Sequence, residues 1–126
     1  MARILVIEDN PDNYELVRFV LERSGHEVVP AFDGRAGLDA AAEIEPDLIL
    51  LDLAIPEVDG WEAARRLKAD DGTKAIPLVA LTAHTLPGDR RRALEAGCDG
   101  YISKPIDVKT FANVISHYLN SENLGE

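Results

Sequence analysis

Five short apolar runs recur along this chain of 126 residues, and a longer segment with helical spacing follows each of them. The runs are 4–7, 28–29, 48–51, 78–81 and 101–102, and the helical patterns cover 11–23, 34–44, 61–68, 88–96 and 108–118. Most runs are continuous rather than alternating, as is typical of strands covered on both faces. Parallel strands need crossover helices, and right-handed crossovers cover both faces of an open sheet. We therefore predict a doubly wound α/β fold, a three-layer (βα)5 sandwich around a five-stranded parallel sheet.

The first helical segment carries specific local expectations. Asp9 or Asn10 is expected to cap its start, because short polar side chains accept hydrogen bonds from the first amides of a helix. Leu16, Phe19 and Val20 fall on one stripe at helical spacing. Such a stripe is the side of an amphipathic helix that packs on a core.

Composition limits the class of protein and the number of domains. The chain is 46% hydrophobic and 29% charged, which is ordinary for a soluble globular protein and too apolar for disorder. Its length fits one domain. We expect residues 1–120 to form this domain and residues 121–126 to be a short tail, with no second domain attached.

The charge balance and the cysteine content exclude several functions. The 13 basic and 23 acidic residues give a net charge of −10, which disfavours DNA, RNA or an anionic membrane as the main partner. The single cysteine, Cys98, excludes an intramolecular disulfide framework and a cysteine-rich zinc site. We expect neither a leader peptide nor a membrane span, and therefore a cytoplasmic location.

Polar side chains that can take part in catalysis or metal binding follow the predicted strands at their carboxyl ends. Glu8 and Asp9 follow the first strand, Asp52 the third, Thr82 the fourth and Lys104 the fifth. In open α/β sheets, ligands bind beyond this edge. Clustered carboxylates repel one another, and a hard divalent cation such as Mg²⁺ relieves that repulsion. These residues suit the transfer of a dianionic phosphoryl group to a carboxylate. Asp52 is the expected nucleophile and would form an acyl phosphate.

Each of these residues also has an ordinary structural explanation. Asp9 alone is typical of a helix cap, and Asp52 alone of a turn after a strand. Thr82 would be an ordinary strand residue and Lys104 a solvated loop lysine. Four independent turn residues have no reason to fall on the same edge in this order, and the conjunction favours a functional site.

Several segments together resemble the CheY-like receiver domain of two-component response regulators, which has a flavodoxin-like fold. The resemblance runs from about residue 3 to residue 119. Within the family, the chain looks similar to stand-alone, DivK-like regulators. The segments that match the family are Glu8-Asp9-Asn10, 52–60, Thr82-Ala83 and Lys104-Pro105. The segments that resemble DivK-like regulators in particular are 101–106 and 47–50.

The resemblance implies a phosphorylation switch rather than an enzyme with a separate substrate. Asp52 would accept a phosphoryl group from a sensor histidine kinase or a histidine phosphotransfer protein, and the domain would promote its own phosphorylation and dephosphorylation. Asp9 and Asp52 would bind Mg²⁺, with Mn²⁺ as a substitute. Glu8 would act directly or through water, and the backbone carbonyl of Ala54 would supply another ligand.

The resemblance also implies how the signal leaves the site. Thr82 and Lys104 would contact the phosphoryl group, and Tyr101 would swing inward as Thr82 moves. The Lys104–Pro105 bond is expected to be cis, which would aim the lysine at the site. The face formed by the fourth helix, fifth strand and fifth helix would then bind a downstream protein, since no output domain or direct DNA binding is expected. Some members of the family dimerise through this face, and the sequence leaves open whether this protein forms such a homodimer.

Two positions depart from common choices in the family. Ala54 and His84 stand two residues beyond Asp52 and Thr82, where side chains tune the rate of hydrolysis in receivers. His84 would titrate near neutrality if it acts there, and an exposed turn histidine is an equal alternative.

Three other functions are alternatives to the phosphorylation switch. A haloacid-dehalogenase-like phosphatase would need a second aspartate at position 54, where this chain has Ala54. A flavodoxin-like mononucleotide binder would need a phosphate loop after the first strand, where Glu8 and Asp9 repel phosphate. A degenerate receiver that only docks is disfavoured by the intact acidic pair with Asp52, Thr82 and Lys104.

A few remaining features have mainly structural interpretations. The basic run 90–92 on the fourth helix is expected to be a solvated face rather than a dock for an acidic partner or RNA. Trp61 is expected to pack at the start of the third helix. Cys98 fits a small turn residue rather than a nucleophile, and no chemistry is assigned to His26 or His117.

Overall fold

The computed structural model describes residues 2–53, 60–82, 87–103 and 106–124, without the side chains of 82, 87–90, 103 and 120–124. Strands and helices alternate five times along it, as predicted. The elements are β1 (Arg3–Ile7), α1 (Pro11–Arg23), β2 (Glu27–Ala31), α2 (Gly34–Ile44), β3 (Leu48–Asp52), α3 (Gly60–Ala69), β4 (Leu78–Thr82), α4 (Pro87–Glu95), β5 (Gly100–Ser103) and α5 (Val108–Leu124).

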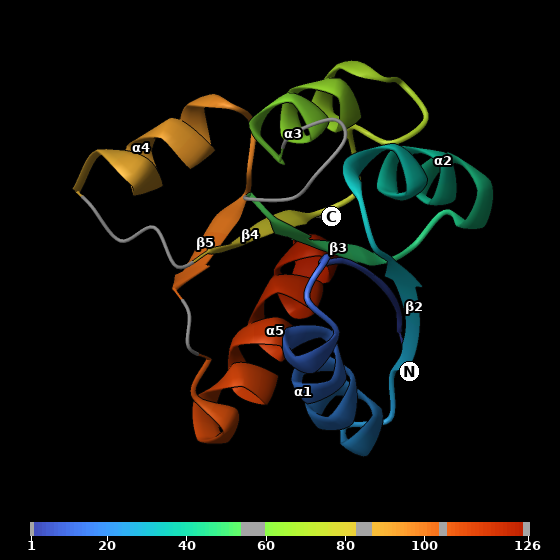
Figure 1. Ribbon diagram of the computed structural model, residues 1–126, viewed down its shortest axis with the longest axis vertical. Helices are drawn as coiled ribbons and strands as arrows, with labels where there is room; N and C mark the ends of the chain where they lie inside the picture. The colour runs from blue at the N-terminus through green and yellow to red at the C-terminus, as the bar shows by residue number, and fades with distance from the viewer. Residues whose placement is uncertain (1, 54–59, 83–86, 104–105, 125–126) are drawn as a thin grey trace.

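The five strands form one parallel sheet in the order β2-β1-β3-β4-β5. Helices α1 and α5 cover one face, and α2, α3 and α4 cover the other (Figure 1). The order reverses direction at β1 and β3, which is the switch point where open α/β sheets bind ligands. The doubly wound three-layer prediction is confirmed.

The central strands are buried along their whole length, which explains their unbroken apolar sequence. All five residues of β3 are buried, and β1 is buried after Arg3. The edge strand β2 is partly exposed and contains Pro30. The Glu27 amide donates to the Ala2 carbonyl and the Ala31 carbonyl accepts from the Glu8 amide, so both groups point toward β1. The N–H that Pro30 lacks would therefore face the free edge.

Helix α1 packs with a different stripe from the predicted one. Leu16 is 39% exposed and Phe19 is 56% exposed, so the expected stripe is wrong for both, although Val20 is buried. The buried stripe consists of Tyr14, Val17, Val20 and Leu21. It spans two full turns of the helix at i, i+3 and i+7, and therefore gives the sheet a longer apolar contact than the shorter stripe.

Helix α5 continues to Leu124, past the predicted end at residue 118 and through most of the segment expected to be a tail. Its buried anchors are Phe111 and Ile115. None of the helices in the described ranges is long and apolar enough to cross a membrane.

Candidate functional site at the carboxyl edge of the sheet

The sheet register brings three carboxylates together. Strands β1 and β3 are neighbours, with Ile7 opposite Leu51, so Glu8 and Asp52 extend the two strands side by side. Glu8, Asp9 and Asp52 each offer a carboxylate oxygen, and these atoms all lie within 4.8 Å of one another. Residues 44 positions apart in sequence thus form one cluster at the switch point.

Burial makes this cluster electrostatically demanding. Glu8 is fully buried and Asp52 is 5% exposed, whereas Asp9 is exposed. Carboxylates so close together raise the free energy of one another's charged forms, and burial adds a desolvation cost. A hard divalent cation with oxygen ligands offsets both effects, so the donor set is compatible with Mg²⁺.

Asn10 caps the following helix and leaves Asp9 available to the cluster. The Asn10 side-chain oxygen accepts hydrogen bonds from the amides of Asp12 and Asn13, at 2.9 and 3.1 Å. The Asn10 amide donates to a carboxylate oxygen of Glu8 at 3.3 Å. Of the two caps left open by the sequence, Asn10 is the one observed. The ordinary capping explanation for Asp9 is therefore wrong.

The backbone of Gly60, the first residue of α3, lies close to the backbone of Leu53, which follows Asp52. A Cβ atom placed on Gly60 would lie 2.3 Å from the Cα of Leu53, so only glycine fits where α3 begins. Glycine at position 60 thus lets the start of α3 approach the end of β3. From the sequence, Gly60 is expected only in a turn before the third helix, and its contact with Leu53 has no sequence signal.

The other predicted site residues are placed less completely. Asp52 pairs with Leu81, and Thr82 with Ser103, so the backbone of Thr82 ends β4 at the same edge of the sheet. The Thr82 side chain is not described. The predictions for Ala54, His84, Lys104 and Pro105 lie outside the described residues.

Comparisons with known proteins agree with this geometry. The family model for the response regulator receiver domain matches residues 4–116. The chain belongs to this family. It is 44% identical over 116 residues to the polar-differentiation response regulator DivK of Brucella anthropi, covering 92% of this chain and 94% of that protein.

Solved receiver structures superimpose over nearly the whole chain. The receiver domain of a sensor histidine kinase from Pseudomonas aeruginosa, solved with a magnesium ion in its active site cleft, gives a TM-score of 0.87 at 32% identity. The alignment covers 94% of this chain and 98% of that one. The chemotaxis response regulator CheY4 of Vibrio cholerae gives 0.88 at 27% identity with the same coverage. The family assignment decides against the phosphatase and mononucleotide-binding alternatives.

The receiver's Tyr101 lies on β5, half-buried against the core beneath α2, α3 and α4. On the same face, the Arg92 guanidinium of α4 lies 4.0 Å from the ring centroid of Trp61 on α3. Part of the predicted solvated basic run is therefore a cation–π contact between two helices. Trp61 packs at the start of α3, as predicted.

The remaining titratable side chains have structural roles. Burial raises the pKa of the Cys98 thiol to about 11, so it stays protonated at neutral pH and is no nucleophile, as predicted. Burial, with the nearby amino terminus, lowers the pKa of His26. The Nδ1 atom of His26 accepts a hydrogen bond from the Ala2 amide at 3.2 Å. His117 is exposed and packs edge-on against Tyr118.

Proposed function

We propose that this receiver is a phosphorylation switch in which Asp52 accepts a phosphoryl group from a sensor histidine kinase or a histidine phosphotransfer protein. The observation that carries the proposal is the cluster of buried Glu8, exposed Asp9 and buried Asp52, whose carboxylate oxygens lie within 4.8 Å of one another. Of the three, Asp52 alone ends a fully buried strand. Its side chain is only 5% exposed, so burial in the strand restricts the positions that its carboxylate can take.

The transfer is an in-line displacement at phosphorus. A carboxylate oxygen of Asp52 forms the new bond to phosphorus. The bond between phosphorus and the donor's imidazole nitrogen breaks, and its electron pair stays on that nitrogen, which then takes up a proton. The product is an acyl phosphate on Asp52 and a neutral histidine on the donor.

The acidic cluster would hold Mg²⁺, with Mn²⁺ as an alternative ion. Glu8 and Asp52 are almost completely buried, and the charge that they share with Asp9 fits a divalent cation. We assign Glu8, Asp9, Asp52 and the backbone carbonyl of Ala54 as its ligands. When bound, the ion supplies positive charge that lowers the repulsion between the carboxylates and the incoming phosphoryl oxygens.

Thr82 and Lys104 are assigned to the phosphoryl oxygens once the transfer is complete. Each charge-assisted hydrogen bond to the new dianion would be worth about 1.5–3 kcal/mol. Pro105 would aim Lys104 at the site. Ala54 and His84 would set the lifetime of the acyl phosphate by how they admit water.

The output surface would be the face formed by α4, β5 and α5, and its partner a downstream protein rather than DNA. Tyr101 would turn inward as Thr82 moves toward the phosphoryl group, and α4 would shift with it. The weak anchoring of α4 supports this assignment, since among its described side chains only Ala93 is buried. We assign the protein to the cytoplasm, where its kinase or phosphotransfer partner would reach it.

Beryllofluoride, which mimics a phosphoryl group on aspartate, tests the proposal with Mg²⁺ present. Binding should shift backbone NMR signals of Thr82 and Tyr101 and change Trp61 fluorescence. Both effects should vanish without Mg²⁺ and in Asp52→Asn. The matched control is Asp39→Asn, which removes the same charge from an exposed position on α2.

Each outcome has a distinct meaning. Binding without change near Tyr101 would refute the proposed output surface. The protein would then accept phosphoryl groups without passing a signal to a partner. A folded protein that does not bind beryllofluoride would overturn the proposal and leave a docking module.

A further inference from the structure

Lys68, in the last turn of α3, has a largely buried side chain that reaches two connections of the fold. The side chain is 18% exposed. Its ammonium group donates to the carbonyls of Lys74 and Ile76 at 3.1 and 2.8 Å, and to a carboxylate oxygen of Asp99 at 2.7 Å. An ammonium group has three protons, so these three bonds use all of its donors.

The bond to Asp99 ties the segment that follows α4 to α3 and to β4. The carboxylate oxygen that accepts from Lys68 also accepts from the Leu78 amide at 2.8 Å, and the Asp99 amide donates to the Leu78 carbonyl at 2.6 Å. Gly97 has a φ of 104°, and a Cβ atom there would lie 2.7 Å from the Cγ atom of Lys68. Glycine therefore lets the chain turn beside the Lys68 stem.

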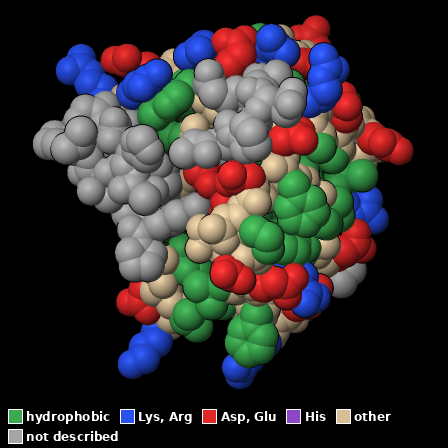
Figure 2. All heavy atoms as spheres, viewed as in Figure 1, with side chains coloured by type: hydrophobic (Ala, Val, Ile, Leu, Met, Phe, Trp, Pro, Cys, Tyr) green, Lys and Arg blue, Asp and Glu red, His purple; other side chains and the backbone are tan. Residues whose placement is uncertain are grey.

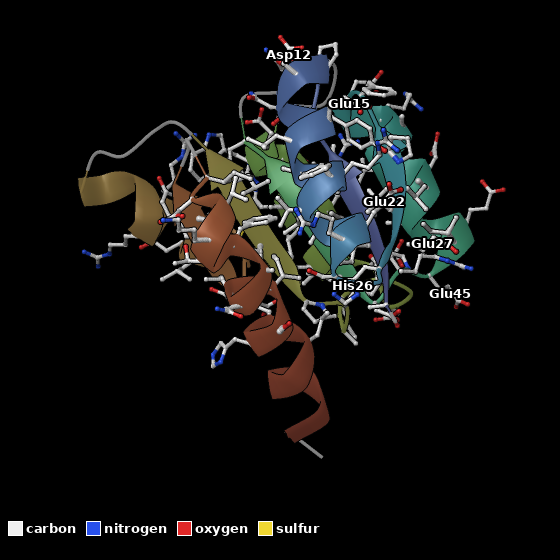
Figure 3. All side chains as sticks on the ribbon, turned by 90° about the horizontal axis from the view of Figure 1, so that it is seen from below. Asp12, Glu15, Glu22, His26, Glu27 and Glu45 are labelled. Carbon is white, nitrogen blue, oxygen red and sulfur yellow. The ribbon has the colours of Figure 1, made fainter. Side chains whose placement is uncertain are left out.

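This attachment lies at the edge of the sheet away from the acidic cluster. Figure 3 shows Asp12, which follows the cluster, and His26, which precedes β2, at opposite ends of α1. Because the strands are parallel, Asp99 before β5 lies at the edge of His26, and Thr82 at the end of β4 lies at the edge of Asp12. Helix α4 therefore begins at the edge that holds the cluster and ends at the Lys68 attachment.

The other ion pairs that α3 and α4 form among the described side chains stay within one helix. Figure 2 shows basic side chains beside acidic ones along the rim where these helices lie in Figure 1. The pairs are Arg65–Glu62, Arg66–Glu62 and Arg91–Glu95. They do not restrain one helix relative to the other. The contact of Arg92 with Trp61 does, and it lies in the last turn of α4, close to the same end.

We propose that Lys68 is a positioning residue that holds the carboxyl end of α4 in place, so that α4 turns about this end when the switch operates. The inference rests on the proposed function, because it specifies how the α4 shift assigned there takes place. Ala96 and Cys98, at the held end, are 7% and 4% exposed. The amino end of α4 would carry most of the displacement, as in a hinge movement.

Hydrogen bonds, rather than close packing, hold Lys68 on one of its sides. Lys68 borders a hollow of about 410 Å³, which Pro77, His117 and Tyr118 also line. Atoms that face a hollow lack partners there and gain little from dispersion. Removing the ammonium group should therefore release the segment around Asp99 without creating a clash.

Amide hydrogen exchange without any ligand tests the attachment. Lys68→Met keeps an apolar stem beside Gly97 and removes the three hydrogen bonds. It should speed exchange of the Asp99 amide at least about tenfold, since a charge-assisted bond that holds this segment is lost. Lys74→Met is the matched control, because the Lys74 side chain pairs with exposed Asp71 and its carbonyl is retained. Circular dichroism would check that both variants remain folded.

Beryllofluoride with Mg²⁺ tests the movement. In the wild-type protein, backbone NMR signals of residues 88–90 should shift several-fold more than those of residues 96–99. In Lys68→Met, the signals of residues 96–99 should also shift strongly, because the held end is released. Lys74→Met should keep the wild-type pattern.

The outcomes separate the inference from the switch on which it rests. Equal exchange of the Asp99 amide in the two variants would overturn the attachment. Equal shifts of residues 96–99 in the two variants would overturn the turning movement and leave the switch intact. A wild-type protein that does not bind beryllofluoride would overturn the switch and the movement together, whereas the exchange measurement would still show whether Lys68 holds Asp99.

Discussion

Helices α1 and α4 are attached to opposite faces of the same sheet by side chains of very different size. Helix α1 buries Tyr14, Val17, Val20 and Leu21, next to Phe111 and Ile115 of α5. In α4, Ala93 is the buried residue among the described side chains, and Ala96 follows just past its end. Leu94, the large apolar residue of its last turn, is half-exposed.

This difference separates a firmly anchored helix, α1, from a weakly anchored one, α4. Burial of apolar area stabilises by about 0.8 kcal/mol for each CH₂ group, so an alanine contributes much less than a leucine or a tyrosine. A shift of α4 therefore disrupts less packing than a shift of α1. The weakly anchored helix α4 belongs to the surface assigned to output, whereas α1 is held in place by large buried side chains.

The largest expected effect tests this comparison directly. Leu21 is fully buried, and Leu21→Ala should lower the free energy of unfolding by about 2–5 kcal/mol, because it removes packing and leaves a cavity. Ala93→Gly should lower it by about 1 kcal/mol, mainly through helix propensity. Urea denaturation followed by circular dichroism measures both. Equal losses in the two variants would remove the distinction between the two helices.

Capping provides a second test on the α1 side. Asn10→Ala should lower the free energy of unfolding by about 1 kcal/mol, because the amides of Asp12 and Asn13 lose their acceptor. Asp9→Ala should leave that cap intact and instead weaken stabilisation by added Mg²⁺. Thermal unfolding with and without Mg²⁺ distinguishes the two. A Mg²⁺ response that Asp9→Ala leaves unchanged would contradict the assignment of Asp9 as a ligand.

The contact between α3 and α4 should show a smaller effect. Arg92→Met keeps an apolar stem over the Trp61 ring and removes the charge, which should lower the free energy of unfolding by about 0.5–1 kcal/mol. Trp61 fluorescence should also change, since the cation beside the ring is lost. Arg91→Met is the control, because among the described side chains Arg91 pairs with Glu95 of its own helix and not with Trp61. Identical spectra for the two variants would refute a role for this contact.

The smallest effect concerns pH. Burial lowers the pKa of His26, so the unfolded chain binds a proton there at a higher pH than the folded protein does. The free energy of unfolding should therefore fall as pH drops below about 6.5, the ordinary histidine value. His26→Gln keeps an acceptor for the Ala2 amide and should make this decline shallower between pH 7.5 and 5.5. Parallel profiles for the two proteins would contradict the role of His26.

The sequence predicted those features that one segment or one strand edge determines. Continuous apolar runs identified the strands, and residues directly after them identified Glu8, Asp9 and Asp52, because parallel strands end at a common edge. These predictions needed no knowledge of how the helices rotate on the sheet.

The features that escaped prediction depend on a choice between similar alternatives or on distant partners. Helix α1 has two apolar stripes, and contact with the sheet selects the one through Val17 and Leu21 rather than the one through Leu16 and Phe19. Arg92 stacks on Trp61 although the two residues are about thirty positions apart, and no local pattern in the sequence predicts this contact. Lys104 and Thr82 stay predictions as phosphoryl contacts.

Pro30 has a consequence for how copies of this protein can join. An exposed edge strand is a template on which another chain can add a strand through main-chain hydrogen bonds. On the free side of β2, Pro30 interrupts the row of donors that such an addition would use. Pro30 therefore opposes the addition of a strand from another copy at this edge. Such addition is the first step by which sheets grow into fibrils.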